Sequence, residues 1–359
     1  MQVGIAGAGA IALGYCALLQ QRGHKPCLWS PSGKRTLSFK QGAALRVQGA
    51  LEGDFNVTVC DSAQELALND VIVLALPANG HRAVVDAIAP HLEARHCVII
   101  SAHLSFAALY LSKILAKRGI QIPIVAWNTT MLTAKSKSST EINVGAIRSK
   151  VEMATVPSEV AEPAHRVCTE LFGELFVIKD DILTIALSNI NPQNHLAIAL
   201  CNLTRIDRGE NWGQRVNVTP TVGRLIEALD MERLSIATAL GKKVHTVIDH
   251  YVSSFAASGS SIFEMSKRLV RNGKDFPGPT SIETRYVLED VPFGLIPITH
   301  LASLVGVEVP LHRSGIQLLA ACYGRDFASD NGLFSEIDVD DLSAFKALIA
   351  KGYGLEAAA

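Results

Sequence analysis

The 359-residue chain has little net charge, because 33 Lys and Arg residues balance 34 Asp and Glu residues to give −1. A protein that binds nucleic acid needs a basic surface to neutralise phosphates, so this balance argues against a nucleic-acid partner. Aromatic residues are also scarce, at 6%, whereas hydrophobic residues make up 48% of the sequence. This composition is typical of a globular protein with tightly packed α/β layers, and the length predicts two domains.

The seven cysteines include no CxxC pair and show no spacing typical of a zinc site. Most of them lie in apolar runs, where cysteine packs as a small hydrophobic residue. The set therefore predicts neither a disulfide framework nor a bound metal. We expect a reducing, cytoplasmic environment.

Residues 1–19 contain no charged side chain and could be mistaken for a signal peptide or a membrane anchor. A signal peptide begins with basic residues, however, and the first basic residue here is Arg22. No other stretch approaches the roughly 18 uninterrupted apolar residues of a membrane-spanning helix. The sequence therefore predicts neither secretion nor a membrane partner.

Short apolar runs alternate with helical patterns in the first half of the chain, which predicts a parallel sheet with crossover helices. The predicted strands are 2–6, 26–29, 71–76, 97–102 and 122–127, with a hairpin at 44–59 and further strands or extended loops over 133–156. The predicted helices of this half are 10–22, 80–92 and 106–118. From about residue 182 helical spacing dominates, and it predicts helices at 196–205, 219–241, 244–256, 296–305 and 342–350, with a loop at 272–281.

A glycine-rich turn follows the first predicted strand, where the sequence reads Gly7-Ala8-Gly9-Ala10-Ile11-Ala12. In this GxGxxA pattern Gly7 permits the tight turn, Gly9 lets a pyrophosphate approach the backbone, and Ala12 lets the helix pack on the strand. The free N–H groups at the start of the helix, near Ala10 and Ile11, bind phosphate. The alternative is a glycine turn that binds nothing. The pattern predicts a Rossmann-type dinucleotide-binding domain, a doubly wound α/β sheet, over residues 1–182, followed by a mostly α-helical domain over 183–359.

The second strand carries the signal for cofactor choice. A NAD site usually has an acidic residue there for the ribose hydroxyls, but this strand is followed by two hydroxyls and two cations, namely Ser30, Ser32, Lys34 and Arg35. These groups suit a 2′-phosphate, so the sequence favours NADP(H) over NAD(H). Alternatively, Lys34 and Arg35 are solvated residues that open the next helix.

The loop after the 71–76 strand begins at Pro77 and should border the nicotinamide end of a cofactor, because ligands lie beyond the carboxyl ends of parallel strands. His81 follows in this loop. It could be catalytic by position, but we expect it on the surface at the start of a helix.

Two polar segments of the second half are unusual for pure scaffold. They are N-x-N-x-x-x-H at 189–195 and T-R-Y-x-x-E-D-V at 284–291. At these residues the chain resembles the octopine/opine dehydrogenase family, and the resemblance extends to the N-terminal GAGAIA and to the 219–241 helix with its Asp-Met-Glu-Arg-Leu centre.

The resemblance implies an oxidoreductase that condenses an α-keto acid, such as pyruvate, with the amino group of an amino acid or amine and reduces the resulting imine. It implies that His195 is the general acid/base, that Asp290 orients it, and that Arg285 holds the keto-acid carboxylate. Asn191 matches a polar residue near the substrate. A proton donor that titrates near neutral pH and a planar guanidinium fork suit these roles. A homodimer is left open.

Two other functions remain open at this point. One is a 2-keto acid reductase similar to ketopantoate reductase, which uses a lysine acid/base; the sequence places no lysine near 189–195. The other is a regulator that senses NADP(H) without turning it over. The amine is not identified, since Arg205, Arg208 and Arg215 could hold its carboxylate or be solvated.

Overall fold

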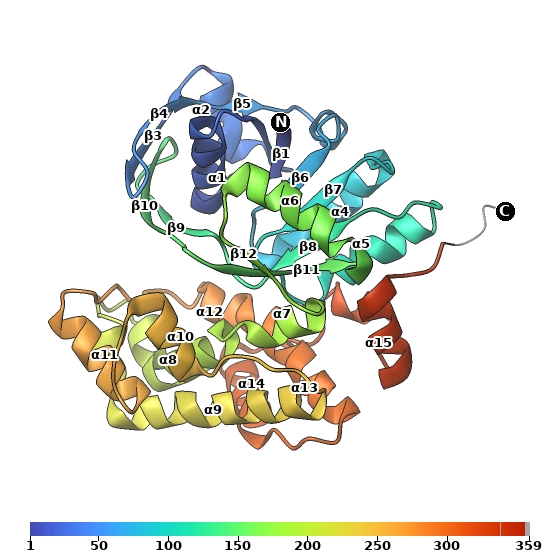
Figure 1. Ribbon diagram of the computed structural model, residues 1–359. Coiled ribbons are helices and arrows are strands. Elements are labelled where there is room, and N and C mark those ends of the chain that lie inside the picture. Colours follow the sequence, from blue (N-terminus) through green and yellow to red (C-terminus); the bar gives the residue numbers. More distant parts are fainter. Residues whose placement is uncertain (338, 356–359) are drawn as a thin grey trace. The chain divides into compact units, whose positions relative to one another are not determined.

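The structure, a computed structural model, describes residues 1–337 and 339–355. The chain forms two compact units, one of Met1–Ala186 with a C-terminal segment from Leu333, and one of Leu187–Gly332. The first is an α/β unit and the second is helical (Figure 1). This confirms the predicted fold class.

The main sheet of the first unit has eight strands in the order β12-β11-β8-β7-β6-β1-β2-β5. Strands β5, β2, β1, β6, β7 and β8 are parallel to one another, and β11 is antiparallel to β8. The bounds are β1 Gln2–Ala6, β2 Lys25–Trp29, β5 Thr58–Val59, β6 Val71–Leu74, β7 Cys97–Ile100, β8 Ile124–Trp127, β11 Val151–Val156 and β12 Phe176–Ile178. Strands β2 and β5 lie on one side of β1, and β6, β7 and β8 lie on the other. The strand order therefore reverses between β1 and β6, and ligands of such sheets bind in the crevice at the carboxyl ends of these two strands.

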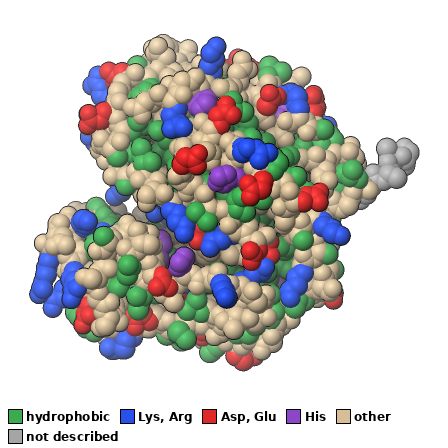
Figure 2. Space-filling view, viewed as in Figure 1, with side chains coloured by type: hydrophobic (Ala, Val, Ile, Leu, Met, Phe, Trp, Pro, Cys, Tyr) green, Lys and Arg blue, Asp and Glu red, His purple; other side chains and the backbone are tan. Residues whose placement is uncertain are grey.

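Helices cover this sheet, as the fully buried strands β6, β7 and β8 require. The helices of the first unit are α1 Ala10–Gln21, α2 Leu37–Lys40, α3 Ala63–Leu66, α4 His81–Ile88, α5 Ala107–Ala116, α6 Ala161–Phe172 and α15 Leu342–Lys351, and α7 Ile182–Ser188 leads into the second unit. Acidic and basic side chains are interspersed on the face of the first unit drawn in Figure 2, in keeping with the small net charge.

A second sheet in the first unit has four strands in the order β4-β3-β10-β9. The predicted hairpin is confirmed as the antiparallel pair β3 (Ala44–Gly49) and β4 (Gly53–Asn56). It does not stand alone, because β3 pairs in parallel with β10 (Glu141–Ile147), which is antiparallel to β9 (Leu132–Ser136). Backbone pairing between β3 and β10 thus joins two hairpins that are distant in the sequence into one sheet.

The helical unit has an apolar core to which Ile198, Ile226, Met265 and Val291 contribute. Its helices are α8 Asn191–Asp207, α9 Pro220–Ala239, α10 Val247–Phe255, α11 Ile262–Arg271, α12 Arg285–Leu288, α13 Ile296–Leu304 and α14 Pro310–Tyr323. The Thr219 side chain accepts the Val222 N–H and so caps α9 where the sequence predicts its start. Helices α11, α12 and α14 were not predicted.

The C-terminal segment departs from the predicted division into 1–182 and 183–359, because it packs with the first unit. Phe345 of α15 is fully buried, with its ring 5.2 Å from that of Phe106. Glu336 forms an ion pair with Arg82 of α4 at 3.0 Å. The predicted helix itself is present, capped by Asp341; sequence periodicity found the helix but could not show which core would bury it.

Cys27 and Cys60 form a disulfide, with their Cα atoms 6.2 Å apart. This corrects the expectation that every cysteine is free. Cys27 lies on β2 and Cys60 directly follows β5, and these strands pair in parallel with Cys27 opposite Thr58. Strand pairing therefore brings together two cysteines whose spacing of 33 residues carries no motif.

By length and composition, the helical stretch Arg285–Leu304 could cross a membrane, although the sequence predicted no such stretch. Two-thirds of its apolar window (67%) is buried inside the protein, as in the core helix of a folded domain. It also contains the buried carboxylates Glu289 and Asp290. A charged group is costly in a bilayer, so we interpret the stretch as core.

Candidate active site

The glycine-rich turn lies at the carboxyl end of β1, at the predicted place. Gly7 has φ +130°, and a Cβ at this position would overlap the carbonyl oxygen of Ala75. Gly9 is the N-cap of α1, and Ala12 is fully buried. Ala10 and Ile11 form the first turn of α1, whose N–H groups have no partner within the helix. No side chain fits at Gly7, and the turn leaves free donors beside the open space at Gly9.

Arg35 is the cation that lies next to this turn. Its Nη1 is 3.8 Å from the position that a Cβ on Gly9 would take, and no other atom comes within 4 Å of that position. Lys34 and Ser32 are exposed, and Ser30 is half-buried. Within the described residues neither Lys34 nor Arg35 forms an ion pair with an acidic side chain. The segment therefore offers uncommitted positive charge beside the open face of Gly9.

The carboxyl ends of β6 and β7 carry two buried histidines. His81 begins α4 and is fully buried rather than exposed as predicted, because its Nε2 donates to the carbonyl of Leu76. Burial lowers the pKa of His81 to about 4. His103, which the sequence did not single out, is also fully buried, and burial together with the nearby His81 lowers its pKa to about 3.

The segment around His103 has an unusual backbone. Ala102, Ser105 and Phe106 all have positive φ, between 50° and 57°, a conformation that is rare for residues other than glycine. Strained backbone of this kind clusters at functional sites. This segment directly follows Ile100, the last residue of β7. Its backbone conformation therefore shapes the carboxyl edge of the sheet together with the side chains.

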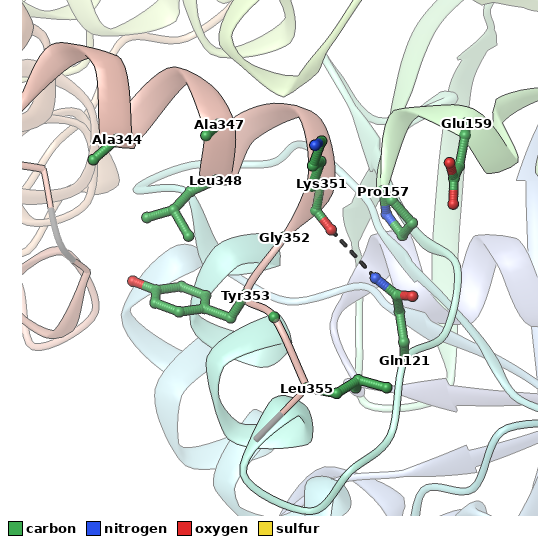
Figure 3. Close-up of a pocket in the computed structure, with 11 residues that line it drawn as sticks. Gln121, Pro157, Glu159, Ala344, Ala347, Leu348, Lys351, Gly352, Tyr353 and Leu355 are labelled. Atoms are coloured by element: carbon green, nitrogen blue, oxygen red, sulfur yellow. Dashed lines mark hydrogen bonds between the residues drawn. The ribbon is translucent and has the colours of Figure 1, made fainter. Parts of the chain in front are cut away.

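A groove of the first unit lies elsewhere. It has a volume of about 700 Å³ and is lined by residues of α15 and by Gln121, Pro157 and Glu159 (Figure 3). Gln121 donates to the carbonyl of Lys351 at 3.3 Å. Gln121 precedes β8 and Pro157 follows the antiparallel β11, so the groove borders the amino edge of the parallel strands. The glycine turn is at the opposite, carboxyl edge.

His195 and Asp290 meet in the helical unit. The Nδ1 atom of His195 donates to Oδ2 of Asp290 at 2.6 Å, and both residues are buried, at 8% and 1% exposed. His195 lies in the first turns of α8, which starts at Asn191 and has Pro192 as its second residue. Asp290 ends the α12 region and precedes a π-helical turn, Val291–Leu295. A buried carboxylate on Nδ1 leaves Nε2 as the nitrogen for proton transfer.

The other predicted residues lie on the same two elements. Asn191 is one helical turn before His195, so the two side chains share a face of α8. Arg285 begins α12, and its side chain is 58% exposed with Nε 3.4 Å from Glu289. The guanidinium is therefore accessible to an anion but already has one carboxylate neighbour.

A second imidazole–carboxylate pair, not singled out in the sequence, lies deeper in this unit. Nδ1 of His312 on α14 is 2.7 Å from Oε2 of Glu232, and its Nε2 is 3.1 Å from the side-chain amide of Gln193. Burial works against ionisation of Glu232, but hydrogen bonds from His312 and two backbone N–H groups leave its pKa below the ordinary value. The pair joins α9, α14 and α8. Among the described residues no group of three His, Cys, Asp or Glu could hold a metal.

Comparison with known families gives two matches on this chain. Residues 178–323 match the alpha-helical domain of NAD/NADP octopine/nopaline dehydrogenase, and residues 3–103 match ketopantoate reductase PanE/ApbA. The first match covers both members of the His195–Asp290 pair, and the second covers the glycine turn.

Individual proteins are similar over nearly the whole chain. The opine dehydrogenase of Arthrobacter sp. (strain 1C) is 26% identical over 345 residues, which cover 95% of this chain and 96% of the relative. The structure of octopine dehydrogenase with NADH and pyruvate superposes with a TM-score of 0.79 at 15% identity, covering 99% and 100% of the chains. The NADP⁺-bound yersinopine dehydrogenase gives 0.69 at 15% identity over 94% and 98%. At such identities the structures establish the fold alone. The family match on the helical unit and the full-length relative make the chain similar to octopine and opine dehydrogenases over nearly its whole length.

Proposed function

We propose that the protein is an NADP(H)-preferring opine dehydrogenase, which condenses an α-keto acid with the amino group of an amino acid or amine and reduces the resulting imine. The observation that most supports this is the buried His195–Asp290 pair, with its 2.6 Å hydrogen bond, on the helical unit that matches the family. The fold alone would suit many dehydrogenases, whereas a proton donor is what the reduction of a C=N or C=O group also requires.

The first unit supports the cofactor part of the proposal. The absence of a Cβ at Gly9 leaves room for a pyrophosphate at the N-terminus of α1. Arg35 lies beside that space, and no Asp or Glu occurs between Trp29 and Arg35, so a 2′-phosphate would find a cation where a free ribose hydroxyl would lack an acceptor. When bound, the nicotinamide cofactor supplies the hydride.

His195 and Asp290 supply the proton chemistry in this proposal. Condensation releases the carbonyl oxygen as water, which needs a proton at that oxygen, and in the reverse direction the secondary amine must lose a proton. The carboxylate of Asp290 keeps a hydrogen on Nδ1 of His195, so Nε2 can accept or donate the proton. Asp290 also stabilises the positive charge that the ring gains when Nε2 is protonated.

Arg285 and Asn191 are the proposed substrate contacts. A guanidinium binds a carboxylate through two parallel N–H donors, and the Arg285 side chain is exposed enough to do so. Glu289 competes for the same guanidinium at 3.4 Å, which would disfavour anions that cannot form the bidentate pair. Asn191 would add a neutral hydrogen bond from the same face of α8 as His195.

The test follows oxidation of NADPH or NADH with pyruvate alone, and then with pyruvate plus a panel of amino acids and amines. Pyruvate is the first choice because octopine dehydrogenase, of the same fold, was solved with it. We expect turnover that needs both substrates and is faster with NADPH. Asp290→Asn should lose most of kcat, since an amide cannot hold the same tautomer or charge on His195.

A 2-keto acid reductase is the second candidate, because residues 3–103 match ketopantoate reductase. It predicts turnover with a keto acid in the absence of any amine, which would replace the first proposal. Binding of NADPH without turnover under any condition would instead favour a cofactor-sensing regulator.

A further inference from the structure

The imidazole of His195 is covered on one face by the aromatic ring of Tyr286. The ring centroids are 3.6 Å apart and the planes differ by only 7°. This is a close parallel stack, and it involves a residue that lies between Arg285 and the Asp290 partner in sequence. Tyr286 belongs to α12, whereas His195 belongs to α8.

Tyr286 is itself held at both ends. Its backbone N–H donates to Oγ1 of Thr284, which caps α12. Its hydroxyl donates to Oε1 of Gln214. Gln214 is buried, and its own backbone N–H donates to the carbonyl of Phe276 at 2.7 Å. The ring is thus anchored through its hydroxyl to the segment that follows α8, so it cannot turn away from the imidazole without breaking the bond to Gln214.

The stack restricts the motion of the imidazole that the hydrogen bond to Asp290 still allows. Held by Cβ at one side and by the Nδ1 hydrogen bond at the other, the imidazole can still rotate over a small range about its Cβ–Cγ bond, because a hydrogen bond tolerates bending; this rotation tilts the ring plane and redirects Nε2. A parallel ring at van der Waals distance removes that rotation. It also presents an electron-rich face to the cation that forms when Nε2 takes up a proton.

Tyr286 does not take part in proton transfer itself. Burial raises the pKa of its phenol to about 12, despite the nearby Arg285 and the hydrogen bond to Gln214. The hydroxyl also points to Gln214 and so is occupied as a donor. What the residue offers His195 is its ring.

We propose that Tyr286 is a positioning residue that sets the plane of the His195 imidazole and thereby the direction of Nε2. This deepens the proposed function and rests on it for the kinetic consequence, but the stack itself can be tested without substrate. Because the ring and the hydroxyl do different things, conservative variants separate them.

Tyr286→Phe keeps the ring and loses only the bond to Gln214, whereas Tyr286→Met keeps much of the volume and loses the stack. We expect Tyr286→Met to lower kcat by about ten-fold or more, since small misplacements of a catalytic group are costly, with KM for the cofactor changed little. Tyr286→Phe should stay within about three-fold of the parent. Equal losses in the two variants, or no loss in Tyr286→Met, would overturn the proposal.

A spectroscopic measurement on the substrate-free protein makes the test independent of activity. In a sample with labelled histidine, the ring protons of His195, assigned by their absence in His195→Asn, should show the upfield shift caused by a stacked aromatic ring. Tyr286→Phe should retain this shift and Tyr286→Met should lose it. If the shift is absent in the parent, the stack is refuted even if the enzyme is active. If it is present and no keto acid–amine pair is turned over, only the proposed function fails.

Should Tyr286→Met fail to fold, Tyr286→Leu removes the ring instead, and Gln214→Leu is its control, because like Tyr286→Phe it removes only the bond to the hydroxyl. Tyr286→Leu should lose the upfield shift of His195, whereas Gln214→Leu should retain it and keep kcat within about three-fold of the parent. An unchanged shift in Tyr286→Leu would overturn the proposal.

Discussion

The glycine turn of the first unit and the His195–Asp290 pair of the second are built in opposite ways. The turn consists of six consecutive residues, Gly7 to Ala12, and works through what they lack, because missing side chains leave room and free backbone N–H groups. The pair consists of two ionisable side chains 95 residues apart in the sequence, and it depends on the fold bringing an imidazole and a carboxylate within hydrogen-bonding distance.

The difference explains what each region can tolerate. At Gly7 of the turn, an added side chain would clash with the backbone, whatever its charge. At the pair, a change of shape could be absorbed, but a buried carboxylate or imidazole without its partner is costly. The same contrast holds for the buried histidines: His195 has a carboxylate on its ring, whereas among the described residues the hydrogen-bond partners of His81 and His103 are backbone groups.

The largest effect should come from removing the chemistry of the second unit. His195→Ala should lower kcat by about 10²- to 10⁴-fold, the usual contribution of a general acid/base, while NADPH binding, measured by fluorescence titration, stays within about three-fold. His245→Ala, an exposed histidine of the same unit, is the control and should keep full activity. Near-normal kcat in His195→Ala would remove it from the mechanism.

The turn should break through bulk alone. Gly7→Ala places a Cβ against the Ala75 carbonyl at φ +130°, so we expect the loss of cofactor binding and a destabilisation of about 2–4 kcal/mol. Gly119→Ala is the matched control, because it has a positive φ of +66° but open space around it; it should cost about 1 kcal/mol. Equal stability of the two variants in urea unfolding would contradict the steric explanation.

The buried His81 and His103, whose hydrogen-bond partners are backbone groups, should make the first unit sensitive to acid. A histidine whose pKa is lower in the folded than in the unfolded protein costs stability once the unfolded state takes up the proton, so the free energy of unfolding should fall as pH drops below about 6.5 and continue to fall toward pH 4. His81 alone should cost about 2 kcal/mol between pH 6.5 and pH 5.

His81→Gln should flatten this pH dependence in urea unfolding curves, whatever it does to stability at pH 7. His91→Gln, which changes a half-buried histidine of the same unit, should leave the dependence as it is. A parent protein whose unfolding free energy is the same at pH 7 and pH 5 would show that neither His81 nor His103 is held neutral by burial.

The smallest expected effect concerns Arg35. If its charge serves a 2′-phosphate, Arg35→Ala should raise KM for NADPH by about ten-fold and leave KM for NADH nearly unchanged, as expected for the loss of one partly solvated charge contact. Lys34→Ala serves as the comparison, since Lys34 is exposed on the neighbouring position. An equal rise of KM for both cofactors would place Arg35 at the shared pyrophosphate instead.

Local patterns predicted much of this molecule. The start of α9 near Thr219, the start of α15 after Asp341 and the turn at Gly7 are each set by residues within four positions of one another, and all three lie where predicted. The predictions failed where contacts between distant parts of the chain decide which residues are buried or paired. His81 was expected at the surface, Cys27 and Cys60 were expected free, and residues from Leu333 onward were expected in the second domain.

By itself the sequence determined the α/β and helical units, the turn suited to a dinucleotide, and, through its resemblance to a family, the names of His195 and Asp290. It could do so because hydrophobic period and glycine placement act over a few residues. Only the tertiary structure decided that those two side chains share a 2.6 Å hydrogen bond, that Tyr286 covers the imidazole, and that Arg35 lies beside Gly9. Each of these depends on packing between segments that no local pattern relates, which is why they had to be seen in three dimensions.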